Sequence, residues 1–145
     1  MRVVLQRVDY AKCTVDGKVT GEINKGYLLL VGYTEGDNLE KNQKAAKKIA
    51  NLRIFEDENG KMNLNLKAVE GAILSISQFT LYANTNDGNR PSFVDAMKPE
   101  AAKELYLQFN ELLRTYDIKV EEGIFGADMK IELLNSGPCT INYEF

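Results

Sequence analysis

Histidine is absent from this chain of 145 residues. Its absence excludes Ser-His-Asp and Cys-His catalysis, HExxH zinc sites and imidazole general bases. No pair of carboxylates has a spacing typical of metal or glycosidic chemistry, and there is no glycine-rich phosphate loop. Any chemistry must therefore use carboxylates, hydroxyls, lysine, tyrosine, backbone dipoles or the substrate itself. We expect neither a metal nor a cofactor.

Cysteine and proline are scarce, with two and three residues respectively. Cys13 and Cys139 lie far apart in the sequence, which is typical of two buried thiols rather than a disulfide or a redox pair. No apolar run approaches the roughly 20 residues that span a bilayer. The first residues, MRVVLQRVDYAK, are too interrupted by polar side chains to form the apolar region of a signal peptide. We therefore predict a cytoplasmic protein with no membrane association.

The rest of the composition is that of a globular protein, with 44% hydrophobic and 27% charged residues. The length suits one domain over residues 1–145, and no linker or repeat divides it. The net charge of -3 argues against broad, charge-driven binding of nucleic acid. Recognition of a single RNA end, which needs only a few contacts and a pocket, stays open.

The hydrophobic pattern predicts strands, a helix, strands, a second helix and further strands. The expected strands cover 3–8, 12–23 (a hairpin turning at Asp16-Gly17), 27–33, 62–66, 71–83 and three segments after residue 117, and segment 51–55 leads from the first helix to the turn before 62–66. Segment 27–33 is too apolar to be half-exposed, so it is expected at the centre of the sheet. This order indicates an α/β fold in which two helices pack on a mixed sheet.

The two helices have start signals in the sequence. Asp37 is the expected N-cap of the first helix, with Glu40 three residues later completing a capping box. Its apolar face is expected to hold Leu39, Ala46, Ile49 and Ala50. Pro99 suits the first turn of the second helix. The apolar stripe of that helix comprises Ala102, Leu105, Tyr106, Phe109, Leu112, Leu113 and Tyr116.

Polar residues interrupt the apolar run SISQFTLY, which begins at Ser75. A buried hydroxyl or amide without a partner costs roughly 1–3 kcal/mol. Strand alternation would place Gln78 and Thr80 on one face and Ser77 and Phe79 on the other. Two interpretations remain open: a core strand whose polar atoms bond to neighbouring backbone, or a strand end that lines a pocket.

The segment NSGPCT is the second unusual stretch. It is either an ordinary turn or, if the Gly137-Pro138 bond is cis, a rigid pair of carbonyls able to hold an ammonium group.

Other single residues also allow two interpretations. Arg7 lies in an apolar strand, where it is either an arginine at the sheet edge or in a structural ion pair, or a residue that positions a loop. Arg90 in GNRPSF belongs to a surface loop or contacts a phosphate or a partner subunit. Phe125 and Met129, both in the motif FGADM, are either core residues or pocket residues.

Taken together and in this order, the stretches MRVVLQRV, NLRIFED, GKMN, SQFTLYA, GNRPSF, PEAA, FGADM and NSGPCT resemble the D-aminoacyl-tRNA deacylase (D-tyrosyl-tRNA deacylase) family. Each motif alone is weak, but their joint occurrence over almost the whole chain is specific. The resemblance implies the fold of that family, a homodimer with active sites at the subunit interface, and the 3′ end of aminoacyl-tRNA as the partner.

The resemblance also implies roles for individual residues. The family's SQxT segment forms the pocket for the terminal aminoacyl-adenosine, and the matching catalytic-site residues are Ser77, Gln78, Phe79 and Thr80. The family's NxGPxT motif carries a cis Gly-Pro bond that enters the partner's pocket; it matches Asn135, Gly137, Pro138 and Thr140. Phe125 and Met129 match pocket-lining positions, and Arg7 matches a residue that orients the Gly-Pro loop. Ser136 and Cys139 depart from the residues common beside this motif.

The expected reaction is hydrolysis of the ester of D-aminoacyl-tRNA, and of Gly-tRNA as well, with L-aminoacyl-tRNA rejected by the Gly-Pro motif. Thr80 could act as a nucleophile, although no residue obviously activates it. Alternatively, a positioned water attacks with help from the ribose 2′-hydroxyl, while amides near Phe79 and Thr80 stabilise the oxyanion; the missing histidine favours this scheme. The rival hypotheses are a non-catalytic module that binds an RNA end or a protein, and a threonine hydrolase of small esters.

Overall fold

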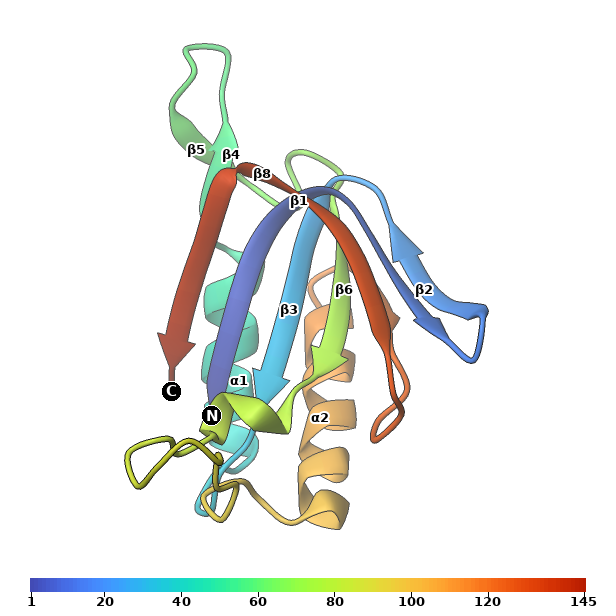
Figure 1. Cartoon of the computed structure of the whole chain (residues 1–145). Coiled ribbons are helices and arrows are strands. Elements are labelled where there is room, and N and C mark those ends of the chain that lie inside the picture. The colour runs from blue at the N-terminus through green and yellow to red at the C-terminus, as the bar shows by residue number, and fades with distance from the viewer.

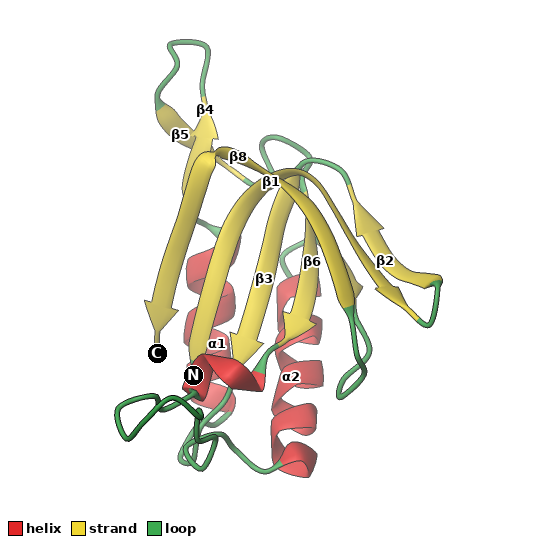
Figure 2. Cartoon of the chain, viewed as in Figure 1, coloured by secondary structure: helices red, strands yellow, loops and turns green.

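A curved sheet of six strands lies against two α-helices in the computed structural model, which describes residues 1–145 (Figure 1). The elements in chain order are β1 (Arg2–Val15), β2 (Lys18–Ile23), β3 (Gly26–Gly32), α1 (Leu39–Ala50), β4 (Arg53–Glu56), β5 (Met62–Asn65), β6 (Ala72–Ser77), the 3₁₀ helix η1 (Phe79–Tyr82), α2 (Pro99–Arg114), β7 (Lys119–Glu122) and β8 (Lys130–Glu144). Figure 2 shows both α-helices on the same face of the sheet. Neither has the length and hydrophobicity needed to cross a membrane.

The sheet is mixed, as the sequence predicts. β1 pairs antiparallel with β2, β3 and β8, whereas β3 pairs with β6 and β6 with β7 in parallel. β3 is central and almost wholly buried, as its apolar sequence indicates. The β1–β2 hairpin turns at Asp16 and Gly17, both with positive φ, which is the geometry that an Asp-Gly turn favours. β4 and β5 form a separate two-stranded hairpin that projects from one end of the molecule (Figure 1).

The core has two parts because the sheet buries both faces. A cluster of 22 buried residues fills the space between the sheet and the two helices. A second cluster of 7 buried residues lies on the other face, inside the curve of β1 and β8. Met129 and Ile131 pack against this second cluster from the start of β8. The smaller cluster therefore supports one wall of the cavity described below.

The first helix begins differently from the expectation. Its N-cap is Asn38, whose side chain accepts a hydrogen bond from the Lys41 N–H; the prediction of Asp37 was wrong. Asp37 is buried instead and binds the amino group of Met1 at 2.7 Å. Leu39, the first residue of the helix, is exposed, contrary to the expectation, whereas Ala46, Ile49 and Ala50 are buried as expected. The second helix begins at Pro99, as predicted.

Two strand predictions were also wrong in their extent. The strand predicted over 71–83 ends at Ser77, and the chain then turns into η1. The segments on either side of the Gly-Pro pair were expected to be two strands joined by a turn. They form the single strand β8, which pairs with β1 along its whole length and bulges in the middle.

Candidate active site

The end of β6 is shaped by a close approach to β3. The Gln78 N–H still donates to the Val31 carbonyl at 2.7 Å, but the chain then crosses over Gly32. A Cβ atom on Gly32 would lie 2.8 Å from the Gln78 carbonyl oxygen, so a larger residue would displace this segment. The 3₁₀ helix begins directly afterwards, and the Ala83 N–H donates to the Thr80 carbonyl. Because the first amides of a helix have no acceptor within it, the Phe79 and Thr80 N–H groups are available to a ligand.

The 3₁₀ turn, rather than strand alternation, sets the directions of the SQFT side chains. Ser77 and Gln78 are half-buried, and Phe79 and Thr80 are exposed. The Gln78 amide donates to the Thr80 hydroxyl oxygen at 2.6 Å, so these two side chains satisfy one another. Phe79 is 57% exposed, which is unusual for a large aromatic residue.

A cavity of about 700 Å³ opens beside this turn. Ser77, Gln78 and Phe79 line it together with Phe125 and Met129, so the structure brings five of the sequence-predicted site residues to one place. Thr80 lies next to them in the chain but does not line the cavity. Its volume lies in the range of small-molecule sites, and most of its lining residues are hydrophobic.

The segment between β7 and β8 forms a second wall. Gly123 makes room for Met129, because a Cβ atom at Gly123 would lie 2.4 Å from the Met129 sulfur. The Phe125 ring lies 6.0 Å from the ring of Tyr106, which is buried and donates a hydrogen bond to the Ser75 carbonyl at 2.8 Å. Burial raises the pKa of Tyr106, despite its hydrogen bonds, so its hydroxyl stays protonated. Both pocket residues thus rest on buried structure.

A third wall was missed in the sequence. It comes from the last residue of GNRPSF, the segment that follows it and the start of α2: Phe93, Val94, Ala96, Met97, Lys98, Pro99 and Ala102. The Phe93 ring contacts the Phe79 ring edge to face, with centroids 5.0 Å apart. Phe93, an aromatic residue in an otherwise polar loop, was the only sign of this wall in the sequence. The position of the loop near β6 depends on tertiary contacts, which the local sequence does not contain.

The cavity lining contains one carboxylate and no histidine. Its titratable residues are Tyr33, Lys98 and Asp128. Burial raises the pKa of Tyr33, whose hydroxyl donates to the Asn42 side chain at 2.9 Å. The carboxylate of Asp128 accepts a hydrogen bond from Lys130 at 3.0 Å. The structure contains no group of three potential metal ligands. The cavity can bind, orient and donate hydrogen bonds, but it offers no activated nucleophile.

The Gly-Pro pair lies in a large bulge of β8. Gln6 pairs with Thr140 and Val8 with Asn135, so residues 136–139 stand opposite Arg7 alone. The Gly137-Pro138 bond is cis, and both residues are exposed. Asn135 holds the base of the bulge: its side chain accepts from the Cys139 N–H and donates to the Thr140 hydroxyl, each at 3.0 Å.

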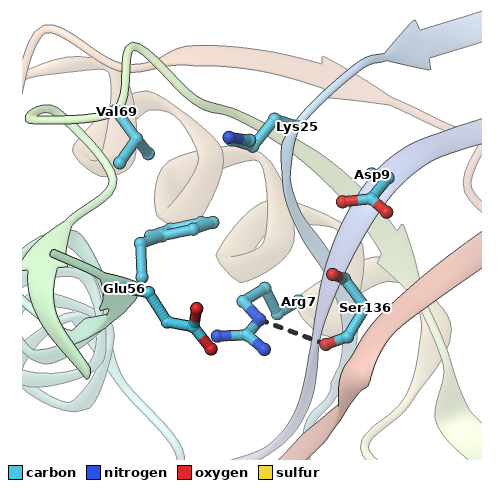
Figure 3. Close-up of a pocket in the computed structure, with 7 residues that line it drawn as sticks. Arg7, Asp9, Lys25, Glu56, Val69 and Ser136 are labelled. Atoms are coloured by element: carbon cyan, nitrogen blue, oxygen red, sulfur yellow. Dashed lines mark hydrogen bonds between the residues drawn. The ribbon is translucent and has the colours of Figure 1, made fainter. Parts of the chain in front are cut away.

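Arg7 fills the space beneath the bulge. Its side chain donates to the Ser136 carbonyl at 3.1 Å and to the Ile54 carbonyl at 2.6 Å, and the residue is only 8% exposed. Figure 3 shows the guanidinium beside Ser136 in a small pocket of about 200 Å³ that Asp9, Lys25, Glu56 and Val69 also line. Gly137 has φ of +126°, and a Cβ atom there would lie 2.8 Å from an Arg7 nitrogen. Arg7 and Gly137 therefore fit together closely.

The bulge and the cavity are separate within one chain. Neither Gly137 nor Pro138 lines the 700 Å³ cavity. In Figure 1 the bend of β8 lies near the β4–β5 hairpin, whereas η1 lies at the other end of the sheet. The predicted site residues thus form two groups: one around the cavity, and one comprising Arg7, Gly137 and Pro138.

The sequence profile of the family described as D-Tyr-tRNA(Tyr) deacylase matches residues 4–144 of the chain. The chain belongs to this deacylase family. It is 60% identical over 141 residues to a D-aminoacyl-tRNA deacylase of Fusobacterium nucleatum subsp. nucleatum, covering 97% of this chain and 93% of the relative. It is 61% identical to a D-aminoacyl-tRNA deacylase of Lactobacillus gasseri over 141 residues, covering 97% of each chain. The resemblance read from the sequence motifs is confirmed.

Two solved structures share the deacylase fold. One, described as c-Myc DNA Unwinding Element Binding Protein, superposes with a TM-score of 0.92 at 38% identity and covers 100% of this chain and 99% of its own. The other, a structural analysis of a probable eukaryotic D-amino acid tRNA deacylase, has a TM-score of 0.84 at 18% identity and covers 98% and 97%. The second likeness supports the fold alone.

Proposed function

We propose that this chain hydrolyses the ester bond of D-aminoacyl-tRNA in the cytoplasm, releasing the D-amino acid and tRNA. The observation that carries the proposal is the open cavity at the end of β6, which is lined by Ser77, Gln78 and Phe79 and whose only carboxylate, that of Asp128, is paired with Lys130. An aminoacyl ester is already labile, so a site that orients water and stabilises an oxyanion is sufficient. Family membership and close relatives named as D-aminoacyl-tRNA deacylases support the same reaction.

In the proposed mechanism, the oxygen of a bound water attacks the ester carbonyl carbon. The Phe79 and Thr80 N–H groups donate hydrogen bonds to the oxyanion that develops. The bond between the carbonyl carbon and the ribose O3′ then breaks, and O3′ takes up the proton that the attacking water loses. The neighbouring 2′-hydroxyl of the substrate orients or activates the water, because the only carboxylate in the lining, that of Asp128, is paired with Lys130. Ser77 and Gln78 shape this side of the pocket, and Phe125 and Met129 line it opposite the terminal adenosine.

Chirality is proposed to depend on a second subunit. The exposed Gly137-Pro138 segment of one protomer enters the cavity of its partner in a homodimer, where its carbonyls accept hydrogen bonds from the substrate's α-ammonium group. This arrangement leaves no room for the side chain of an L-amino acid and admits glycine. Its support is that the bulge is exposed, held firmly by Arg7 and Asn135, and outside the cavity of its own chain. Arg7 acts in this scheme as a positioning residue.

The test is deacylation by the purified protein of D-Tyr-tRNA, L-Tyr-tRNA and Gly-tRNA, with EDTA present throughout. We expect rapid release of D-tyrosine and glycine and slow release of L-tyrosine. Rapid release of L-tyrosine would contradict exclusion by the Gly-Pro segment. No release of any amino acid would favour a non-catalytic binding module on the same fold. Hydrolysis of a small D-tyrosine ester at the same kcat/KM as D-Tyr-tRNA would favour a small-ester hydrolase.

A further inference from the structure

The wall of the cavity formed by residues 93–98 presents a combination of side chains that the hydrolysis itself does not use. Phe93 is 37% exposed and Val94 is 84% exposed, although both are hydrophobic. Lys98 follows at the end of the same segment and also lines the cavity. Together with Phe79, which is 57% exposed, these residues form an apolar rim with one positive charge.

This rim is held in place by hydrogen bonds at several points. The Asn84 and Ser92 backbones exchange two bonds of 2.8 and 2.9 Å just before Phe93. The Thr34 hydroxyl donates to the Asp95 carbonyl at 2.6 Å, and the Met97 N–H donates to the Tyr33 carbonyl at 2.9 Å. The rim therefore needs little ordering when a ligand binds, and its exposed aromatic face is a fixed feature.

The charge at the rim favours an anionic ligand. Lys98 is the only cation that lines the cavity, and it forms no salt bridge. The only carboxylate in the lining, that of Asp128, is paired with Lys130. A positive charge is thus free at the mouth of the cavity, although the chain as a whole carries a net charge of -3.

We propose that this rim binds the unpaired nucleotides that precede the terminal aminoacyl-adenosine of tRNA, with Lys98 contacting a phosphate and Phe93 stacking on a base. Single-stranded RNA is bound in general by aromatic platforms beside positive charges. The rim is continuous with the cavity that holds the ester in the proposed function, so a chain leaving that cavity passes over it. A second protein copy would bury the apolar residues equally well, but the free charge of Lys98 favours RNA. The inference rests on the proposed function and adds a contact that selects long substrates.

The experiment compares two substrates: intact D-Tyr-tRNA, and D-tyrosyl-adenosine, which lacks the preceding nucleotides. For Lys98→Gln we expect KM to rise about fivefold more with the tRNA than with the adenosine ester. The slope of log(kcat/KM) against log[salt] for the tRNA should flatten by about 0.7, the value for one phosphate contact in a single strand. Lys103→Gln, on the next turn of α2 and outside the cavity lining, is the matched control and should change neither quantity.

Phe93 is tested with a pair of substitutions. Phe93→Leu keeps an apolar contact with Phe79 but removes the aromatic face, so we expect KM for the tRNA to rise about tenfold relative to the adenosine ester. Phe93→Tyr keeps the ring and should restore the wild-type ratio. Thermal unfolding and sedimentation of each variant show whether fold and oligomeric state are unchanged.

Each outcome separates this inference from the proposed function. Wild-type protein that hydrolyses neither substrate refutes the proposed function itself. If the wild type hydrolyses both substrates and Lys98→Gln changes KM equally for both, or for neither, the RNA contact is overturned. The proposed function then still stands. If the Phe93 variants dissociate an oligomer and impair both substrates alike, the rim is an interface between protein copies, and the RNA contact is likewise overturned.

Discussion

Thr80 carries the only aliphatic hydroxyl in the 3₁₀ turn of the site, yet its environment does not favour nucleophilic attack. Its oxygen accepts a hydrogen bond from Gln78 at 2.6 Å, and the residue does not line the cavity. We expect Thr80→Ala to keep kcat for D-Tyr-tRNA within about tenfold of wild type, because the Thr80 contribution is its backbone N–H. Single-turnover kinetics measures this directly. A loss of several orders of magnitude, with binding and fold intact, would instead support a threonine nucleophile.

Gly137 allows a sharper test of a single position. Alanine at this residue adds a Cβ atom at positive φ and 2.8 Å from an Arg7 nitrogen, so the bulge must shift. We expect kcat/KM for D-Tyr-tRNA to fall about a hundredfold, since small displacements of a positioning group have effects of this size. Gly36→Ala is the control: Gly36 has φ of +86° and nothing within 4 Å of the added atom. Gly36→Ala should lower stability by about 1 kcal/mol and leave activity unchanged. Equal activity in the two variants would show that the bulge has no part in the reaction.

The start of β1 and the turn before α1 are joined by Asp37. Burial by itself would raise the pKa of Asp37, but hydrogen bonds from Lys41, the Met1 amino group and the Thr34 N–H outweigh it, and the net pKa lies below the ordinary value of 3.8. A carboxyl whose pKa is lower in the folded state stabilises the fold above its unfolded pKa. That stabilisation is lost as the pH falls from about 4 through the lowered pKa.

We therefore expect Asp37→Asn to lower the free energy of unfolding by about 3 kcal/mol at pH 7, because it leaves the buried amino group of Met1 without its counter-ion. Urea unfolding measures the free energy of unfolding at pH 7 and pH 3. Between these two pH values it should fall less for the variant than for the wild type. Glu40→Gln, in the exposed pair with Lys44 on the same helix, is the control and should have little effect at either pH. An Asp37→Asn variant with wild-type stability at pH 7 would mean that this ion pair contributes nothing net.

Periodicity predicted the two helices and most of the strands, but not the early end of β6 or the continuity of β8 through the Gly-Pro pair. The central position of β3 and the start of α2 at Pro99 follow from local hydrophobicity and from the fixed φ of proline. The end of β6 at Ser77 depends on the Gly32 backbone lying beneath Gln78, and the bulge of β8 depends on Arg7 beneath Ser136. Both contacts join residues more than 40 positions apart, so no local pattern contains them. For the same reason Phe93 and Lys98 were missed as parts of the site, whereas Phe125 and Met129 were placed by family resemblance.

The arrangement of the two site groups in one chain leads to a test with two chains. A variant blocked in the cavity, Ala127→Trp, keeps an intact bulge, and Gly137→Ala keeps an intact cavity. If the bulge acts in the partner's cavity, each variant homodimer is impaired at both sites. A mixed dimer instead has one site built from an intact cavity and an intact bulge.

Equal mixing after reversible unfolding should therefore restore about a quarter of the wild-type site activity, because half of the dimers are mixed and each has one functional site. The measurement is D-Tyr-tRNA deacylation before and after mixing, with differently tagged chains co-purified to show that mixed dimers have formed. Each variant refolded alone is the control and should gain no activity. Mixed dimers without recovered activity would place the bulge and the cavity in the same functional unit of one chain, and the proposed source of chiral selection would then have to lie within the cavity wall itself.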